Sequence, residues 1–202
     1  MVIDEARKLI DDLDRPRKLT VMLGSLCHDF GKPLTTRPEN GRIRSKGHED
    51  AGVPPTDSFL KNLNVNSIAG YDVRQEVKAI VANHLVPNHF YKATSKGDRV
   101  SDGAFRRLAG RVDPELLYRV ARADCLGRTG EFKPDAEEWF IAKVRALGVA
   151  EGPPAKLLLG RHLIELGVEP GPKMRKVIDA VYELQLDGKV TSIDQAIAAA
   201  RA

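Results

Sequence analysis

Residues 15–31 read RPRKLTVMLGSLCHDFG, a helical pattern with the polar pair His28-Asp29 near its end. The apolar positions recur at the three- and four-residue spacing of one helix face, and they are Leu19, Met22, Leu23, Leu26 and Phe30. Pro16 suits the first turn of this helix, and Gly31 suits its end. Asp29 lies on the apolar face, where a carboxylate is costly unless it is paired or binds a metal. The stretch therefore predicts a buried helix that directs Asp29 inward.

Two further predicted helices, residues 71–85 and 113–127, are interrupted in the same way. His84 in the first and Asp124 in the second lie three, four and seven residues after apolar side chains of the same stripe. His48 adds a fourth group, because it begins the helix that follows the polar stretch 32–47. Polar loops of that length in compact domains tend to be functional.

These interruptions predict a metal site. The candidate ligands are His28, Asp29, His48, His84 and Asp124. A mixed histidine and carboxylate set suits Mn²⁺, Fe²⁺, Co²⁺, Ni²⁺ or Zn²⁺, and Mg²⁺ is also compatible with it. A bound ion lowers the pKa of its water and supplies a nucleophile, and two ions would clamp a phosphoryl group. The pattern therefore predicts one or two divalent ions and phosphate chemistry.

Each candidate also has a purely structural interpretation. A single histidine on an apolar stripe is more often a hydrogen-bonded core residue than a ligand. Asp124 could pair with Arg122 or Arg128. Cys27 and Cys125 each adjoin a candidate ligand, but we interpret both as core residues because cysteine is often buried. Interruptions on three separate helices favour the metal site.

Basic residues near the candidate ligands are predicted to bind substrate phosphate. Lys32 closely follows the His-Asp pair, Arg44 lies in the polar stretch, and Arg128 follows the third interrupted helix. A solvated surface is an equally good interpretation of Arg44 and Arg128. Asp29 and Lys32 are the predicted catalytic residues, Asp29 by handling a proton and Lys32 by neutralising charge.

The rest of the chain predicts an all-α fold with no convincing strand. Further helices are expected at 2–14, 102–110, 135–147, near 155–166, at 172–187, and after a capping-box pattern at Ser192. Pro54-Pro55 predicts a kink or two short helices after His48. The stretch GVAEGPP, residues 148–154, is the best linker candidate, so we expect a bundle over 1–148 and a small helical region over 155–202.

Composition excludes several classes of protein. The chain has 202 residues, 42% hydrophobic and 30% charged, which excludes bulk disorder and allows a core without disulfides. The sequence has no run of about 18 apolar residues, so it predicts no membrane span. With only two cysteines a disulfide framework is not expected, and we expect the protein in the reducing cytoplasm. The net charge of +4 permits a polyanionic partner such as RNA without requiring one.

These motifs, in this order, resemble the HD superfamily of metal-dependent phosphohydrolases. The motifs are HDFGK at 28–32, GHE at 47–49, His84, and AD at 123–124. LCHDFGKP, KGHEDAGV and ARADCLGR are more closely similar to the HD region of bacterial CCA-adding tRNA nucleotidyltransferases. Residues 157–197 are similar to the tail of the same enzymes, so the resemblance covers nearly the whole chain.

The resemblance implies an all-helical fold and a divalent-metal phosphohydrolase of the 2′,3′-cyclic phosphodiesterase, 2′-nucleotidase and phosphatase type. The central ligands it implies are His28, Asp29 and Asp124. His48 and His84 match histidines that serve phosphate or a second metal, and Lys32 matches a lysine that faces the phosphate.

The chain departs from the family pattern at two points. The nucleotide-adding head carries a Gly-Gly or Gly-Ser turn before Asp-x-Asp on a strand, whereas Gly24-Ser25 here lies in a predicted helix. We therefore expect no nucleotide addition by this chain alone. HD proteins also take a first histidine from the preceding helix, and no histidine precedes His28. This predicts weakened metal affinity and a chain that begins just after that ligand.

The sequence leaves three hypotheses for function. The first is a phosphohydrolase acting on nucleotides or RNA 3′ ends. The second is the tRNA-binding body of a CCA-adding enzyme with a vestigial metal site, whose partners include tRNA and a separate nucleotidyltransferase head or a second copy of the chain. The third is an HD enzyme of signalling nucleotides, which the similarity of the tail disfavours. Hydrolysis and salt-sensitive RNA binding discriminate the first two.

Overall fold

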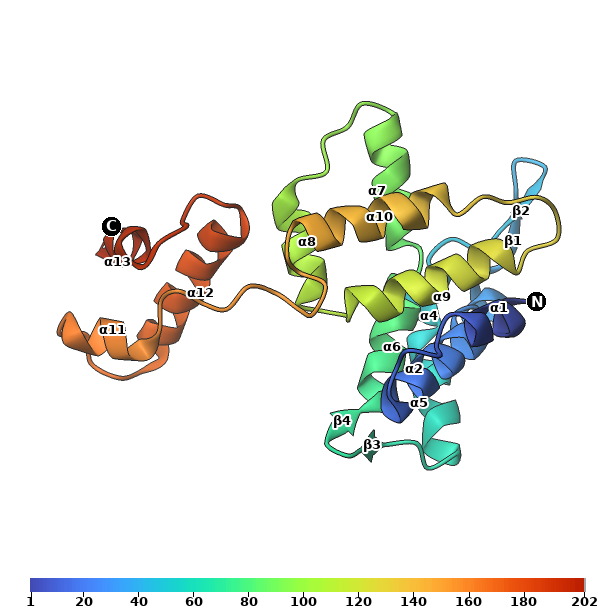
Figure 1. Ribbon diagram of the computed structural model, residues 1–202, viewed down its shortest axis with the longest axis horizontal. Coiled ribbons are helices and arrows are strands. Elements are labelled where there is room, and N and C mark those ends of the chain that lie inside the picture. Colours follow the sequence, from blue (N-terminus) through green and yellow to red (C-terminus); the bar gives the residue numbers. More distant parts are fainter. Residues whose placement is uncertain (202) are drawn as a thin grey trace.

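The computed structural model describes residues 1–201. Within them the fold is all-α, as predicted, and the β-structure is limited to two small two-stranded sheets (Figure 1). The helices up to residue 146 are α1 (Val2–Lys8), α2 (Arg15–Cys27), α3 (Lys32–Thr35), α4 (His48–Ala51), α5 (Val53–Asn62), α6 (Val73–Asn83), α7 (Val86–Ser95), α8 (Asp102–Ala109), α9 (Pro114–Leu126) and α10 (Asp135–Ala146). The later helices are α11 (Gly160–Glu165), α12 (Pro172–Leu186) and α13 (Ile193–Arg201). The strands are β1 (Arg37–Glu39), β2 (Arg42–Arg44), β3 (Ser67–Ile68) and β4 (Tyr71–Asp72).

Aspartate caps fix the start of the three helices whose C-terminal ends position most of the candidate ligands. The side chains of Asp14, Asp72 and Asp113 accept hydrogen bonds of 2.9–3.1 Å from backbone N–H groups in the first turns of α2, α6 and α9. Each cap satisfies donors that a helix cannot pair internally. Local sequence therefore sets where these helices begin.

The three capped helices pack directly against one another. Helix α2 contacts both α6 and α9, α1 lies along α9, and α10 contacts α7 and α9 (Figure 1). The core between them is formed by side chains such as Val21, Ile80, Leu117, Val120 and Phe140, which are fully or almost fully buried. This packing holds the polar ends of α2, α6 and α9 in a fixed relation.

The helices α11–α13 have a separate apolar core. Its buried members are Leu158, Leu163, Met174, Val181, Val190 and Ala196. Figure 1 shows these helices set to one side of the bundle, next to α8. Arg107 on α8 donates to the carboxylates of Glu183 on α12 and of Asp187, directly after α12, at 2.8 and 2.7 Å, and Arg106 donates to the Leu186 carbonyl at 2.8 Å. The division into a bundle that ends at 148 and a helical region that begins at 155 is our proposal.

The polar stretch 32–47 is more structured than its sequence analysis suggested. The prediction of no strand was wrong here, because β1 and β2 pair as an antiparallel hairpin across Asn40-Gly41. Asn40 and Gly41 have φ values of 51° and 72°, as a two-residue hairpin turn requires. A second short pair, β3 with β4, precedes α6.

Three helical expectations also need correction. The helix expected to run through Phe30 to a stop at Gly31 ends at Cys27, because the Phe30 N–H bonds to the Cys27 carbonyl in a tighter turn that contains His28 and Asp29. The expected helix 2–14 ends at Lys8, and the Leu9 carbonyl accepts a hydrogen bond from Arg119 on α9 instead of continuing the helix. Helix α7 was not expected, yet Pro87 suits its first turn and Phe90 packs edge-on against Phe105 with ring centroids 5.0 Å apart. The predicted break at Pro54-Pro55 is confirmed, because α4 ends and α5 begins on either side of Gly52.

Candidate metal centre

A close approach of two backbone corners creates the site. Gly31 follows the end of α2, and Gly52 lies between α4 and α5. A Cβ atom on Gly31 would lie 2.0 Å from the His48 carbonyl oxygen and 2.6 Å from the Gly52 nitrogen. Only a residue without a side chain permits this contact. Glycine at these corners therefore lets Asp29 approach His48, which is distant in sequence.

Three buried histidines are oriented by the same local device. The Nδ1 atoms of His28, His48 and His84 lie 2.7–2.8 Å from the carbonyl oxygen three residues earlier in the chain. A carbonyl only accepts hydrogen bonds, so each Nδ1 must carry the proton. Each ring therefore directs its Nε2 atom toward the others.

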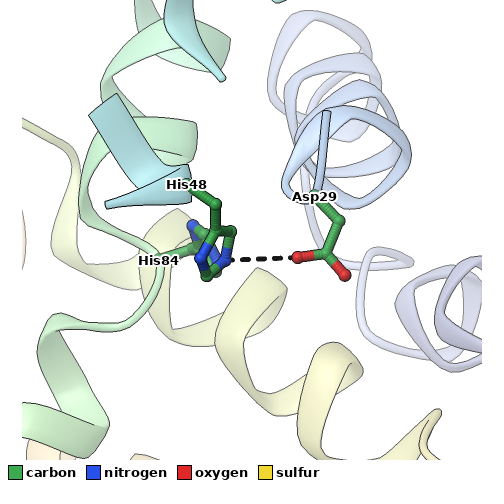
Figure 2. A group of neighbouring side chains, drawn as sticks. All are labelled: Asp29, His48 and His84. Atoms are coloured by element: carbon green, nitrogen blue, oxygen red, sulfur yellow. Dashed lines mark hydrogen bonds and ion pairs between the residues drawn. The ribbon is translucent and has the colours of Figure 1, made fainter. Parts of the chain in front are cut away.

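The Nε2 atoms converge on the Asp29 carboxylate. His48 Nε2 lies 3.3 Å from Asp29 Oδ1 and 3.2 Å from His84 Nε2. Donor atoms of these three residues all lie within 4.8 Å of one another. Figure 2 shows the His48 and His84 rings together on one side of the view, with the Asp29 carboxylate facing them across the marked His48–Asp29 contact. Two histidine nitrogens and a carboxylate oxygen form a donor set that binds divalent transition metals.

His28 and Asp124 extend this cluster toward α9. His28 Nε2 lies 3.2 Å from Asp29 Oδ2 and 3.4 Å from Asp124 Oδ1. This nitrogen is buried and has no hydrogen bond of good geometry. The other Asp124 oxygen, Oδ2, accepts a hydrogen bond of 2.5 Å from Arg128. The structure therefore brings together all the predicted ligands, with Asp124 shared between His28 and Arg128.

The protonation states differ sharply within the cluster. Burial alone would lower the pKa of His28, but the carboxylates of Asp124 and Asp29, 3.4 and 3.2 Å from its Nε2, outweigh burial and raise that pKa to about 9. Burial lowers the pKa of His84 to about 4, and the nearby rings of His28 and His48 reinforce this effect. Burial disfavours the charged carboxylates, yet His28 and the paired cations hold the pKa of Asp124 at about 2 and that of Asp29 well below its usual range. At neutral pH both carboxylates are therefore ionised, and His84 is neutral.

Comparison with protein families decides the classification. Residues 1–129 match the HD domain family, which is more than half of the chain. The chain belongs to the HD domain family. No solved structure matches it significantly.

The relatives of this HD domain include tRNA nucleotidyltransferases. A CC-adding tRNA nucleotidyltransferase of Thermus thermophilus is 30% identical over 187 residues, which cover 88% of this chain and 38% of that protein. An A-adding tRNA nucleotidyltransferase of Deinococcus radiodurans is 29% identical, with 88% of this chain and 40% of that protein covered. A multifunctional CCA protein of Haemophilus influenzae is 39% identical over 134 residues, covering 64% and 30% respectively. The chain thus spans two fifths or less of the length of these relatives.

The donor chemistry of this HD domain fits a divalent ion. A proton fixed on Nδ1 leaves Nε2 as the metal-binding nitrogen, and a hydrogen-bonded Nδ1 is the usual support of a histidine ligand. The buried His28 Nε2 atom lacks a good partner within the described chain, residues 1–201. The ionised carboxylates of Asp29 and Asp124 supply the negative charge that a dication needs.

The predicted phosphate-binding cations lie at different distances from the cluster. Lys32 donates to Asp29 Oδ2 at 2.6 Å, and its side chain is about half exposed. Arg128 contacts Asp124 directly and is also about half exposed. Arg44 lies on β2, 3.9 Å from Glu39, and lines a hairpin pocket of about 370 Å³. Its neighbour Ser45 supplies the carbonyl that orients His48, so the backbone next to Arg44 supports the site.

Several other polar residues lie outside the cluster. His89 is exposed on α7, and His162 is half-buried on α11, where its Nδ1 accepts the Leu159 N–H. Cys27 and Cys125 are buried, as predicted, and burial raises the pKa of the Cys27 thiol to about 12. A thiol that stays protonated is a poor metal ligand.

Sequence reasoning missed one buried acid close to the site. Glu137 on α10 is only 1% exposed, and Asn88 on α7 donates to its carboxylate at 2.5 Å. Burial raises the pKa of Glu137, and Arg128 is among the charges that oppose this effect. The sequence carried a signal for this residue, because Glu137 lies on the same helix face as the buried apolar residues Phe140 and Val144.

Proposed function

We propose that this chain is a divalent-metal-dependent phosphohydrolase that acts on nucleotides or RNA ends, with 2′,3′-cyclic phosphodiesterase or phosphatase chemistry. The observation that carries the proposal is the convergence of Asp29, His48 and His84, whose donor atoms lie within 4.8 Å of one another. Membership of the HD domain family supports the same chemistry.

Two groups of ligands suit one or two ions. His28, Asp29 and Asp124 would hold one ion, and His48 and His84 would hold a second that shares Asp29. A divalent ion in this position provides a Lewis acid and a water of lowered pKa for attack on phosphorus. Activity with each of Mn, Ni, Mg, Co, Fe and Zn in turn would identify the metal.

The chain's own cations are proposed to receive the phosphate. Lys32 and Arg128 donate to the carboxylates of Asp29 and Asp124, at 2.6 and 2.5 Å, and neutralise them. When a dication takes over that role, both side chains are exposed enough to turn toward a phosphate oxygen. Arg44 is a more distant candidate, on the hairpin. Because the pKa of Asp29 is far below neutrality, this carboxylate is a poor proton acceptor, and we assign it to metal binding in preference to proton transfer.

The test compares two aspartate variants. Asp124→Ala should lower kcat/KM for a nucleoside 2′,3′-cyclic phosphate with Mn²⁺ by at least about 100-fold, because it removes a ligand and frees Arg128. Asp194→Ala is the matched control, since Asp194 is exposed on α13. Circular dichroism verifies that both variants keep wild-type helicity. Undiminished hydrolysis by Asp124→Ala would refute the assignment.

A second function is favoured by a separate observation. The relatives named tRNA nucleotidyltransferases match 88% of the chain, well beyond the HD match that ends at residue 129. We therefore also consider an RNA-binding body with an incomplete metal site, whose nucleotidyltransferase head lies elsewhere or on another chain. It predicts salt-sensitive tRNA binding without hydrolysis, and a flat response to tRNA at low salt would count against it.

A further inference from the structure

The loop between α9 and α10 displays an unusual side chain. The side chain of Phe132 is 48% exposed, and among residues 1–201 it is the one phenylalanine, tyrosine or tryptophan that is neither buried nor half-buried. The other aromatic side chains within that range are buried or half-buried. An exposed phenylalanine in a polar loop lacks the packing that normally retains such a residue.

Phe132 is held in place beside the candidate metal centre. The Arg128 guanidinium carbon lies 5.9 Å from the centroid of its ring. The same guanidinium donates to Asp124 Oδ2 at 2.5 Å. Asp124, Arg128 and Phe132 thus form a continuous row that leads from the cluster to the surface.

The loop backbone also shapes this row. Gly130 has a φ of 120°, a conformation that side-chain-bearing residues rarely adopt. A Cβ atom at Gly130 would lie 3.2 Å from the Phe132 ring. Glycine here lets the loop fold back so that the ring lies against its own backbone on one side.

We propose that Phe132 is a specificity-determining residue that stacks on the nucleobase of the substrate, with Arg128 between it and the phosphate. The proposal rests on the proposed hydrolase function and narrows its substrate to phosphates that carry a base. A nucleotide has a flat apolar ring a short distance from its phosphate, and the row presents a cation and an aromatic ring in that order. Base stacking on an aromatic ring tolerates every base, so the selection is for a nucleobase and not for a sequence.

The experiment compares two substrates that share a reacting group. One is adenosine 2′,3′-cyclic phosphate, and the other is glycerol 1,2-cyclic phosphate, which has no base. Phe132→Ala should raise KM for the nucleotide about tenfold, with kcat nearly unchanged, whereas Phe132→Trp keeps the wild-type value. The glycerol compound should be hydrolysed equally by all three proteins. Ile164→Ala, which removes an exposed apolar side chain from α11, is the matched control.

The outcomes separate the two proposals. An equal loss on both substrates, or no loss on the nucleotide, would overturn the stacking role. If the wild type hydrolyses neither substrate, the hydrolase proposal fails, and binding of adenosine 2′-monophosphate with Mn²⁺ then decides the stacking role. Weaker binding by Phe132→Ala than by Phe132→Trp supports it, and equal binding by the two variants overturns it.

Discussion

The bundle α1–α10 and the unit α11–α13 use buried space in opposite ways. All eight buried polar or charged residues of the described chain lie in the bundle, and four of them are the candidate ligands His28, His48, His84 and Asp124. The buried core of α11–α13 is entirely apolar within the residues described. Burying polar groups is unfavourable unless they are paired, so their concentration in one region marks where chemistry is expected.

The two regions also differ in how their parts are joined. In the bundle, the corners at Gly31 and Gly52 meet with no room for a side chain. In contrast, α12 is attached to α8 by exposed arginine pairs such as Arg107 with Asp187. Close-packed backbone contacts tolerate almost no change, whereas exposed ion pairs contribute little and weaken with salt. The bundle should therefore be sensitive to single substitutions, and the attachment of α12 to α8 should be tolerant.

The largest expected effect comes from Gly31→Ala. Its new Cβ would lie 2.0 Å from the His48 carbonyl, so the corner must separate and withdraw Asp29 from His48. We expect a loss of at least about 3 kcal/mol of stability, about 10 °C in Tm, together with loss of metal binding. Thermal unfolding and elemental analysis measure both.

Gly171→Ala is the control for this substitution. Gly171 lies before α12 with extended backbone and nothing within 4 Å of an added Cβ. It should leave Tm and metal content unchanged. A Gly31→Ala protein with wild-type metal content would show that the close approach does not create the site.

The second prediction concerns a ligand. His84→Ala should lower the affinity for Mn²⁺ more than about 100-fold, because it removes a neutral nitrogen that faces His48 Nε2 at 3.2 Å. His162→Ala, on α11, should not change the affinity, since α11 belongs to the separate α11–α13 unit, which carries no candidate ligand. Titration calorimetry measures both. Equal affinities in the two variants would remove His84 from the ligand set.

Much of the site could be predicted from sequence because its ligands interrupt apolar helix stripes. Asp29, His84 and Asp124 each stand where the helical period calls for an apolar side chain, and the structure brings their side chains into one cluster. Helix caps such as Asp113 were equally visible, because they depend only on nearby residues. The apolar stripes and the helix caps were therefore reliable signals.

The features that sequence reasoning missed depend on contacts between distant elements or on backbone atoms. The contact of Gly31 with His48 joins two corners that no local pattern relates. The carbonyl oxygens that orient the histidines have no side-chain signature at all. The hairpin was different, since Asn40-Gly41 is a known turn signal that the polar composition of its surroundings obscured.

The third prediction is that metal binding releases a proton from His28, a residue of the bundle. The pKa of His28 is about 9, so the ring is protonated at pH 7.5 before an ion binds. A metal must displace this proton, whereas His84, with a pKa of about 4, has none to lose. We expect release of about one proton per ion at pH 7.5, and an affinity that rises up to about tenfold per pH unit until about pH 9. Calorimetry in buffers of different ionisation enthalpy counts the protons, and a count of zero at pH 7.5 would contradict the assignment of His28.

The smallest effect is expected where α12 is attached to α8. Arg107→Ala removes two exposed ion pairs, to Glu183 and Asp187, and should change Tm by no more than about 2 °C. Metal affinity should stay at the wild-type value, because neither core loses a buried contact. Limited proteolysis within residues 148–159 should nevertheless become faster, since α12 loses both ion pairs of Arg107 and keeps the Arg106 hydrogen bond to α8, and wild-type protein should approach the same rate at high salt. Arg175→Ala, which loses only a 3.6 Å pair within α12, should be cleaved at the wild-type rate. Should Arg107→Ala instead abolish metal binding, the two regions would be coupled, and the contrast between a demanding bundle and a tolerant attachment would fail.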